Sequence, residues 1–231
     1  MQRRKVAIIP ARGGSKRIER KNLKPFHGMP IMAYSIRLAH SCGLFDEVVV
    51  SSDDSEILEV ARQYGASTPF VRPQALSTDE AATLPVIKHA VENLGLNAED
   101  MVCCIYPTAP LLEEKYLKEG LEALSVQAGK DYAFSVVEFE SSPFRGFAIQ
   151  DEVLTLLFPK YQLFRSQDLQ KIYHDAGAFY WGYARSFVEE RAIFGADSIP
   201  VVLPRMLAQD IDTMDDWHLA EIKYKMKHGS E

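Results

Sequence analysis

The feature that most constrains the fold is a regular alternation of short apolar runs with segments of helical periodicity. The apolar runs, each expected to form a β-strand, lie at residues 5–11, 47–52, 67–73, 101–107, 132–139 and 198–204. Segments with helical spacing occupy residues 30–43, 54–65, 78–95, 112–127 and 185–194, and a last one begins near residue 214. This alternation predicts an α/β fold with a mostly parallel central sheet flanked by helices. Ligands of such sheets bind outside the carboxyl ends of the strands.

One stretch, at about residues 139–172, departs from this alternation. It is rich in turn residues and short extended runs and has no helical period. We therefore expect a single domain over residues 1–231 with a strand-rich arm inserted at 139–172. The large apolar side chains of this arm include Phe144, Phe147, Leu156, Leu157 and Phe158. A monomer would cover that much apolar surface poorly, which predicts a homodimer with the arm in its interface.

Length and composition narrow the class of protein. The chain has 231 residues, which suits one α/β domain, and 47% apolar residues supply an ordinary core. No apolar stretch is long enough to cross a membrane and none resembles a leader sequence, so we expect a cytoplasmic protein without a membrane partner. The three cysteines, two of them adjacent in an apolar run, form no disulfide framework.

Positive charge is concentrated near the amino terminus. Residues 1–24 hold nine Lys and Arg against one acid, although the net charge of the whole chain is −6. In the stretch IIPARGGSKRIERKNL, the cations Arg12, Lys16 and Lys21 follow the first expected strand and surround a glycine pair. Glycine lets backbone N–H groups approach an anion, and ammonium and guanidinium groups suit phosphate oxygens.

This local cluster indicates a small anion such as a triphosphate, because a protein that binds nucleic acid is more often basic over a whole face. The spacing is neither that of a Walker A loop nor that of a dinucleotide-binding loop. The alternative interpretation is a solvated basic loop without a ligand.

Two carboxylates near the carboxyl terminus form a second candidate site. Asp210 and Asp212, in the stretch QDIDTMDDW, are two residues apart at the end of an expected strand, so they should project to the same side. Their oxygens suit Mg²⁺, which commonly joins protein carboxylates to substrate phosphates. The alternative is helix capping, for which Thr213 and Asp216 have the right spacing. The two interpretations are compatible, because Thr213 can cap a helix whether or not the aspartates bind a metal.

Two further segments carry polar residues whose function the local pattern leaves open. Arg72, Ser77 and Asp79 lie in VRPQALSTD, where Ser77 and Glu80 are spaced for a capping box. His174 precedes an aspartate in an aromatic segment, and such a pair is compatible with base chemistry. No nucleophile accompanies it, so a structural histidine is the alternative.

Taken together, the motifs resemble those of the cytidylyltransferases that activate nonulosonic acids, the CMP-nonulosonic acid synthetase or acylneuraminate cytidylyltransferase family. The resemblance rests on IIPARGGSKRIERKNL, VRPQALSTD, YPTAPLL, DAGAFY and DIDTMDDW and extends over nearly the whole chain. The segment RSQDLQKIYHDAGAFYWG is most similar to that of the members that use pseudaminic acid. The resemblance implies a nucleotide-diphospho-sugar transferase-like fold, dependence on Mg²⁺, and a dimer whose arm reaches into the partner subunit.

The resemblance also implies roles for individual residues. The nucleotide and phosphate contacts are matched by Arg12, Lys16, Lys21 and Asn22, and the residues near the base and ribose by Arg72 and Ser77. The metal carboxylates are matched by Asp210 and Asp212, and the residues expected to act in catalysis are Lys16, Lys21 and Asp212. The residues expected to face the sugar are Tyr106, Arg165, Gln167 and His174, with Arg165 as the partner of its carboxylate.

The implied reaction joins CTP to an acidic nine-carbon sugar and gives the CMP-sugar and pyrophosphate. Sialic acid members of the family tend to carry QPTSPLR where this chain has YPTAPLL. Tyr106 thus replaces a glutamine that faces the sugar in those enzymes, which favours pseudaminic acid over N-acetylneuraminic acid unless Tyr106 merely packs against its neighbours. The same motifs are compatible with legionaminic acid as the substrate, and with a non-catalytic protein that binds nucleotide sugars.

Overall fold

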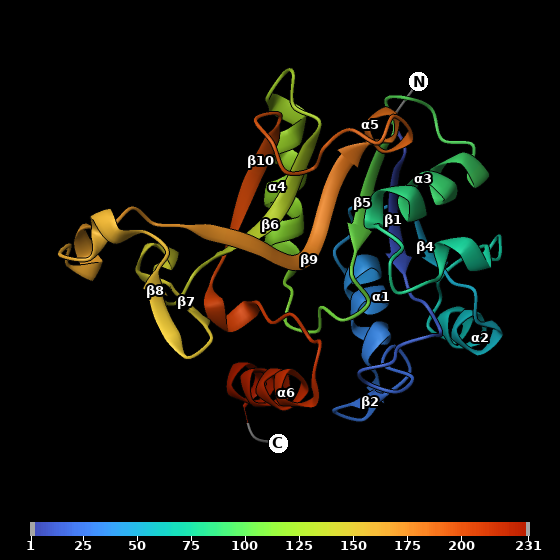
Figure 1. Ribbon diagram of the computed structural model, residues 1–231. Coiled ribbons are helices and arrows are strands. Elements are labelled where there is room, and N and C mark those ends of the chain that lie inside the picture. Colours follow the sequence, from blue (N-terminus) through green and yellow to red (C-terminus); the bar gives the residue numbers. More distant parts are fainter. Residues whose placement is uncertain (1–2, 230–231) are drawn as a thin grey trace.

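The computed structural model describes residues 3–229 and confirms a mixed α/β fold with a mostly parallel central sheet (Figure 1). The strands of that sheet are β1 (Lys5–Pro10), β4 (Glu47–Ser51), β5 (Met101–Ile105), β6 (Tyr132–Glu138), β9 (Tyr173–Tyr183) and β10 (Ser198–Leu203). Their order across the sheet is β10-β6-β9-β5-β1-β4. Strand β9 runs antiparallel to its neighbours β5 and β6, and the other pairs are parallel.

Helices cover both faces of this sheet. Side chains from α1 (Ile31–Ser41), α2 (Ser55–Gln63) and α4 (Glu114–Val126) pack against one face, and those from α3 (Thr83–Asn93) and α5 (Ala184–Val188) pack against the other. The central strands are apolar on both faces for this reason. Cys103 belongs to the first buried cluster and Cys104 to the second, and burial raises the pKa of both thiols.

A third buried cluster lies beyond the carboxyl ends of the parallel strands, where α6 (Met214–His228) closes the molecule (Figure 1). Its buried side chains are Ile18, Phe26, Ile31, Ile211, Trp217 and Ala220, and it includes the small ribbon of β2 (Pro25–Phe26) and β3 (Met29–Pro30). Thr213 and Asp216 form the predicted capping box at the start of α6. Because Ile18 comes from the basic loop after β1 and Ile211 lies between Asp210 and Asp212, this third cluster packs the two loops against each other.

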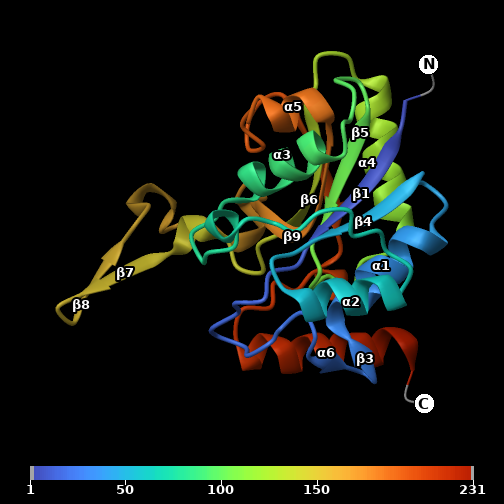
Figure 2. The same cartoon turned by 90° about the vertical axis from the view of Figure 1, so that its right-hand side faces the viewer.

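The segment between β6 and β9 forms an arm that projects away from the sheet, as two perpendicular views show (Figures 1 and 2). Its tip is an antiparallel hairpin of β7 (Phe147–Gln150) and β8 (Val153–Leu156). Exposed apolar side chains on the arm include Phe147, Ile149, Val153, Leu154, Leu157 and Leu163. This segment lies between the end of β6 at Glu138 and the start of β9 at Tyr173.

The prediction of a strand at residues 67–73 is wrong. Within residues 3–229, this segment pairs with the sheet through one isolated bridge, between Val49 and Ser67. Pro69 and Pro73 interrupt the segment, and proline lacks the N–H group that a ladder requires. The described chain also contains no helix with both the length and the apolar character needed to span a bilayer.

Two other local expectations are also wrong. Ser77 does not begin a helix with a capping box, because α3 starts at Thr83 and has Ala82 as its N-cap. Strand β10 ends at Leu203, and a 3₁₀ turn follows it, so Asp210 and Asp212 lie in a loop rather than at the end of a strand. Their common orientation comes from the packing of that loop and not from strand alternation.

Candidate active site

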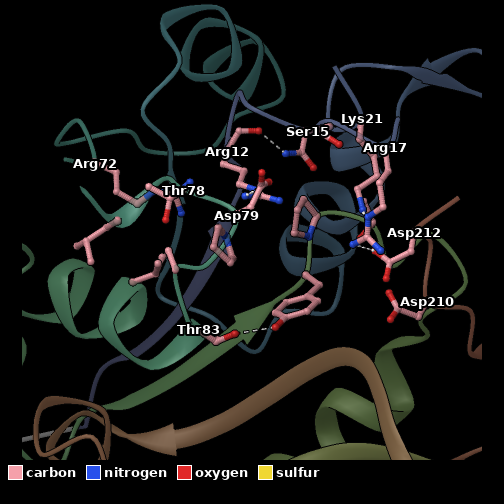
Figure 3. A pocket seen from close by; sticks show the side chains of 18 residues that line it. Arg12, Ser15, Arg17, Lys21, Arg72, Thr78, Asp79, Thr83, Asp210 and Asp212 are labelled. Atoms are coloured by element: carbon pink, nitrogen blue, oxygen red, sulfur yellow. Dashed lines mark hydrogen bonds and ion pairs between the residues drawn. The ribbon is translucent and has the colours of Figure 1, made fainter. Parts of the chain in front are cut away.

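A cavity of ≈ 340 Å³ lies beyond the carboxyl ends of β1 and β5 (Figure 3). It is bounded by the basic loop after β1, the segment before α3, the loop after β5 and the loop before α6. The charged and polar residues in its lining are Arg12, Ser15, Arg17, Lys21, Asn22, Arg72, Thr78, Asp79, Thr83, Tyr106, Thr108, Asp210 and Asp212. Most of the residues predicted for nucleotide and metal binding therefore meet at the edge of the sheet where a ligand was expected.

The glycine loop after β1 has a defined shape. The Gly13 backbone N–H donates to Asp53 Oδ1 at 3.1 Å, and a Cβ atom at Gly13 would lie 2.6 Å from Asp54 Oδ2. Glycine is therefore required at this close approach. Asn22 closes the other end of the loop, because its Nδ2 donates to the carbonyl oxygen of Arg12 at 2.8 Å.

Arg12 and Lys16 share one anionic partner. Arg12 Nη1 lies 2.7 Å from Asp79 Oδ1, and Lys16 Nζ lies 2.7 Å from Asp79 Oδ2. Arg12 lines the cavity, whereas Lys16 lies at its margin with 84% of its side chain exposed. The structure thus places Lys16 beside the predicted nucleotide site, held there by Asp79.

Lys21 joins the basic loop to the acidic one. Its Nζ donates to the carbonyl oxygen of Ile211 at 2.6 Å and lies 3.8 Å from Asp212 Oδ1. Burial lowers the pKa of this ammonium group, while the charges of Asp212 and Asp210 act in the opposite direction. Arg17 Nη2 also reaches Asp212 Oδ1, at 2.7 Å (Figure 3). Two cations of the basic loop therefore converge on Asp212.

Arg72 and Asn22 present buried polar atoms that are suited to a ligand. Arg72 is 4% exposed, and its Nε donates to Ser77 Oγ at 3.1 Å, which places Ser77 as a support for Arg72 outside the cavity lining. Among residues 3–229, neither Arg72 Nη2 nor Asn22 Oδ1 has a hydrogen-bond partner, although Arg72 Nη2 forms a long ion pair with Asp53 Oδ1 at 3.8 Å. Because buried polar groups are nearly always hydrogen-bonded, these two atoms mark places where a polar ligand would satisfy the protein.

Asp210 and Asp212 line this cavity and also a second one of ≈ 460 Å³. Burial, followed by the charge of Asp212, raises the pKa of the Asp210 carboxyl. In the described part of the chain, no group of three or more His, Cys, Asp or Glu is placed to hold a metal. Mg²⁺ is commonly held by one or two carboxylates together with substrate phosphates and water, so the pair fits this ion.

Tyr106 stands at the start of the loop after β5. Its hydroxyl group lies 2.7 Å from Thr83 Oγ1, and its ring centroid lies 5.5 Å from that of Tyr180. Burial raises the pKa of this phenol to about 12, so the hydroxyl is neutral and forms hydrogen bonds. At Gly177, where φ is +59°, a Cβ atom would lie 3.9 Å from Asp210 Cγ and 4.0 Å from Tyr106 Cδ2. Tyr106 and Asp210 thus lie close to the same glycine.

The residues predicted to face the sugar are not all brought together. His174 lines the second cavity with Asp210 and Asp212. Arg165 lies on the arm, where its Nε is 2.8 Å from Asp168 Oδ2, and Gln167 lines a separate cavity at the base of the arm. Within one chain, Arg165 and Gln167 are therefore not part of the nucleotide cavity.

Arg17, Asp79 and Thr83 line the cavity, although the sequence alone assigned them no role. Each makes its defining contact with a residue from a distant segment, so no local spacing marks it. The position of Asp79 could have suggested a role, because it follows Arg72 in a polar segment near the expected binding edge. Nothing in the local sequence suggests a role for Thr83, because its partner is the hydroxyl group of Tyr106.

Comparison with known proteins identifies the class to which this fold and cavity belong. The family model described as Cytidylyltransferase matches residues 6–196, and the chain belongs to this family. It is 48% identical over 228 residues to the pseudaminic acid cytidylyltransferase of Campylobacter jejuni strain 81-176, with 97% of this chain and 98% of the relative covered. It is 30% identical to the CMP-N,N'-diacetyllegionaminic acid synthase of Legionella pneumophila, with 94% of each chain covered.

A comparison of structures agrees with this assignment at the level of fold. The structure of CMP:2-keto-3-deoxy-manno-octonic acid synthetase complexed with CTP matches with a TM-score of 0.71, covering 98% of this chain and 100% of that one. The sequence identity is 13%, so the likeness is evidence for the fold alone.

Proposed function

We propose that this protein transfers the cytidylyl group of CTP to pseudaminic acid, giving CMP-pseudaminic acid and pyrophosphate. The observation that carries the proposal is the convergence of Arg12, Lys21 and the pair Asp210 and Asp212 in one cavity at the carboxyl ends of the strands. The identity of 48% to a pseudaminic acid cytidylyltransferase supports the choice of sugar. We further propose that the enzyme works in the cytoplasm, where its buried thiols stay reduced.

In the proposed reaction, the anomeric hydroxyl oxygen of the sugar bonds to the α-phosphorus of CTP. The bond between this phosphorus and the oxygen that bridges to the β-phosphate breaks, pyrophosphate leaves with the electron pair, and the hydroxyl proton is released to solvent. Negative charge grows on the leaving phosphates and on the equatorial oxygens. Lys21 is held in position before the reaction by its bond to the carbonyl oxygen of Ile211, and a fixed cation lowers the barrier without rearrangement. Arg12 and Lys16 supply further positive charge to the phosphates.

The remaining residues of the cavity bind and orient the substrates. Arg72 and Asn22 offer the nucleoside polar atoms that lack a hydrogen-bond partner within the described chain. Asp210 and Asp212 would hold Mg²⁺, which when bound neutralises phosphate charge. The two cavities share these aspartates, so we place the sugar across their junction, between Tyr106 of the first cavity and His174 of the second. Arg165 can meet the sugar carboxylate only from the arm of a partner subunit.

The proposal is tested by measuring pyrophosphate release from CTP with pseudaminic acid, N-acetylneuraminic acid and legionaminic acid in turn. We expect the highest kcat/KM with pseudaminic acid. A higher value with another of these sugars would reassign the substrate and leave the reaction in place. No release with any of them would favour the non-catalytic binding protein.

We expect the chain to sediment as a homodimer at micromolar concentration, with the arm in the interface. The reason is the exposed apolar surface of the arm, where Leu163 is 94% exposed in the single chain. Leu163→Glu should weaken the dimer by at least about tenfold, since a charge buried at an apolar contact is costly. Val126→Glu, at an exposed site on α4, is the matched control and should leave the dimer intact. A wild-type monomer at this concentration would contradict the prediction.

Tyr106→Gln is expected to lower the preference for pseudaminic acid over N-acetylneuraminic acid by about tenfold or more. The apolar ring suits a sugar surface that carries a methyl group, whereas an amide both donates and accepts hydrogen bonds. Thr83→Val leaves the Tyr106 ring in place and removes only the hydrogen-bond partner of the Tyr106 hydroxyl group, so it should change the sugar preference less. The readout is the ratio of kcat/KM for the two sugars, and a ratio within about twofold of wild type for Tyr106→Gln would exclude this role.

A further inference from the structure

We infer that Asp79 is an internal counter-ion that competes with phosphate groups for Arg12 and Lys16, and that it returns to these cations as pyrophosphate leaves. The inference deepens the proposed function, because it assumes that Arg12 and Lys16 bind the phosphates of CTP. It assigns Asp79 a role in setting how tightly the cavity holds polyphosphate, without direct contact with the substrate.

The geometry places one carboxylate across two cations. Asp79 Oδ1 is 2.7 Å from Arg12 Nη1 and Asp79 Oδ2 is 2.7 Å from Lys16 Nζ, so each oxygen of Asp79 has its own cation. The ion pair with Lys16, assisted by Arg12, lowers the pKa of the Asp79 carboxyl, which is therefore ionised. Figure 3 shows Asp79 beside Arg12 in the cavity lining, so an anionic group of this chain occupies a cation that the proposed function assigns to phosphate.

The contacts of Asp79 are weak enough for a phosphate group to replace it at Arg12 and Lys16. All three side chains are partly exposed, at 32% for Arg12, 84% for Lys16 and 37% for Asp79. Ion pairs at such positions are weak. Asp79 also belongs to the segment between the 3₁₀ turn η1 (Gln74–Leu76) and α3. Backbone bonds from this segment, Ser77 N to Gln74 O and Ala81 N to Thr78 O, close turns, so its displacement breaks no sheet ladder.

Competition follows from the charges. A phosphate that binds Arg12 and Lys16 while Asp79 stays in place would put a second anion within a few ångströms of the carboxylate, and like charges at that distance repel. The phosphate must therefore displace Asp79, and the lost ion pairs reduce its net affinity. After transfer, the separated pyrophosphate meets the same competitor, which favours its release.

The alternative role for Asp79 is that of a residue that supports bound phosphate, by keeping Arg12 and Lys16 in position. The two roles predict opposite results for an isosteric neutral variant. Removal of a competitor makes polyphosphate bind more tightly, whereas removal of a support makes it bind more weakly. A structural defect would also weaken binding, so a gain in affinity is specific to competition.

The experiment is calorimetric titration of the full chain with pyrophosphate and with tripolyphosphate, without divalent cations or sugar. Asp79→Asn should bind pyrophosphate about tenfold more tightly than wild type, given two partly exposed ion pairs. Asp79→Glu, which restores the carboxylate, should bind as wild type does within about threefold. Glu80→Gln is the matched control, because Glu80 is exposed and absent from the cavity lining. It should change the affinity by less than about twofold.

Equal or weaker binding by Asp79→Asn would overturn the inference, as would an equal gain in Glu80→Gln or the absence of polyphosphate binding in wild type and variants alike. Thermal unfolding of each variant, and Asp79→Ser as a second neutral variant, guard against misfolding. The titration requires no turnover, so its result is separate from the proposed function. A tight-binding Asp79→Asn variant of a chain that releases no pyrophosphate from CTP would leave the inference in place and remove the proposed reaction.

Discussion

Asp212→Asn is expected to lower kcat by about a thousandfold at saturating CTP and sugar while the protein remains folded. Asparagine keeps the shape of the side chain but removes the charge that a hard divalent cation requires. The fold should tolerate the change, because the ion pair between Asp212 and Arg17 is partly exposed and such pairs add little stability. The backbone N–H of Asp212 still donates to Asp216 Oδ2, at 3.2 Å.

The measurement is turnover over a range of Mg²⁺ concentrations, together with thermal unfolding. Asp215→Asn is the control, because Asp215 is an exposed acid three residues further along, in the first turn of α6. It should retain activity within about twofold. If Asp212→Asn kept near-normal activity at limiting Mg²⁺, the assignment of Asp212 as a metal ligand would be wrong.

Lys21→Met is expected to lower kcat/KM for CTP by about a hundredfold. Methionine keeps the length and apolar character of the stem but removes the ammonium group that donates to the carbonyl oxygen of Ile211 at 2.6 Å. That group also lies 3.8 Å from Asp212 Oδ1, at the junction of the proposed phosphate and metal sites. Its loss removes positive charge from a half-buried position, where charge is screened less than at the surface.

Lys24→Met is the control for this variant. Lys24 belongs to the same basic segment, but its ammonium group lies over the ring of Trp217, at 5.6 Å, and outside the cavity lining. We expect Lys24→Met to retain kcat/KM within about threefold. An equal loss of activity in both variants, or a loss matched by a fall in the folded fraction measured by circular dichroism, would argue that Lys21 supports the fold and has no specific role in the reaction.

Several features of this protein follow from local sequence. The alternation of apolar runs and helical segments depends on spacings of two to four residues, and it predicted the α/β class. The capping box of Thr213 and Asp216 spans three residues and was confirmed. Such features can be predicted from the sequence because the interacting residues are close neighbours along the chain.

Local sequence patterns failed to predict the structure where proline residues, loop packing or strand direction determined it. Residues 67–73 have the composition of a strand, but the prolines at 69 and 73 limit them to an isolated bridge. The apolar sequence of β9 does not indicate whether the strand runs parallel or antiparallel to its neighbours. The chain leaves β6 for the arm at the carboxyl edge of the sheet and returns from that edge, which makes β9 antiparallel to β5 and β6.

The chemistry of the cavity was decided by contacts between distant segments. Arg17 and Asp212 are separated by 195 positions, and they meet because the cluster of Ile18, Ile211 and Trp217 packs their loops together. Asp79 reaches Arg12 and Lys16 in the same way, across the edge of the sheet. By itself, the sequence determined the class of fold and the residue types able to bind phosphate and metal, because those depend on local spacing and side-chain chemistry. Tertiary structure alone decided which anion faces which cation, and kept Arg165 away from the cavity of its own chain, because such pairings depend on how remote segments pack.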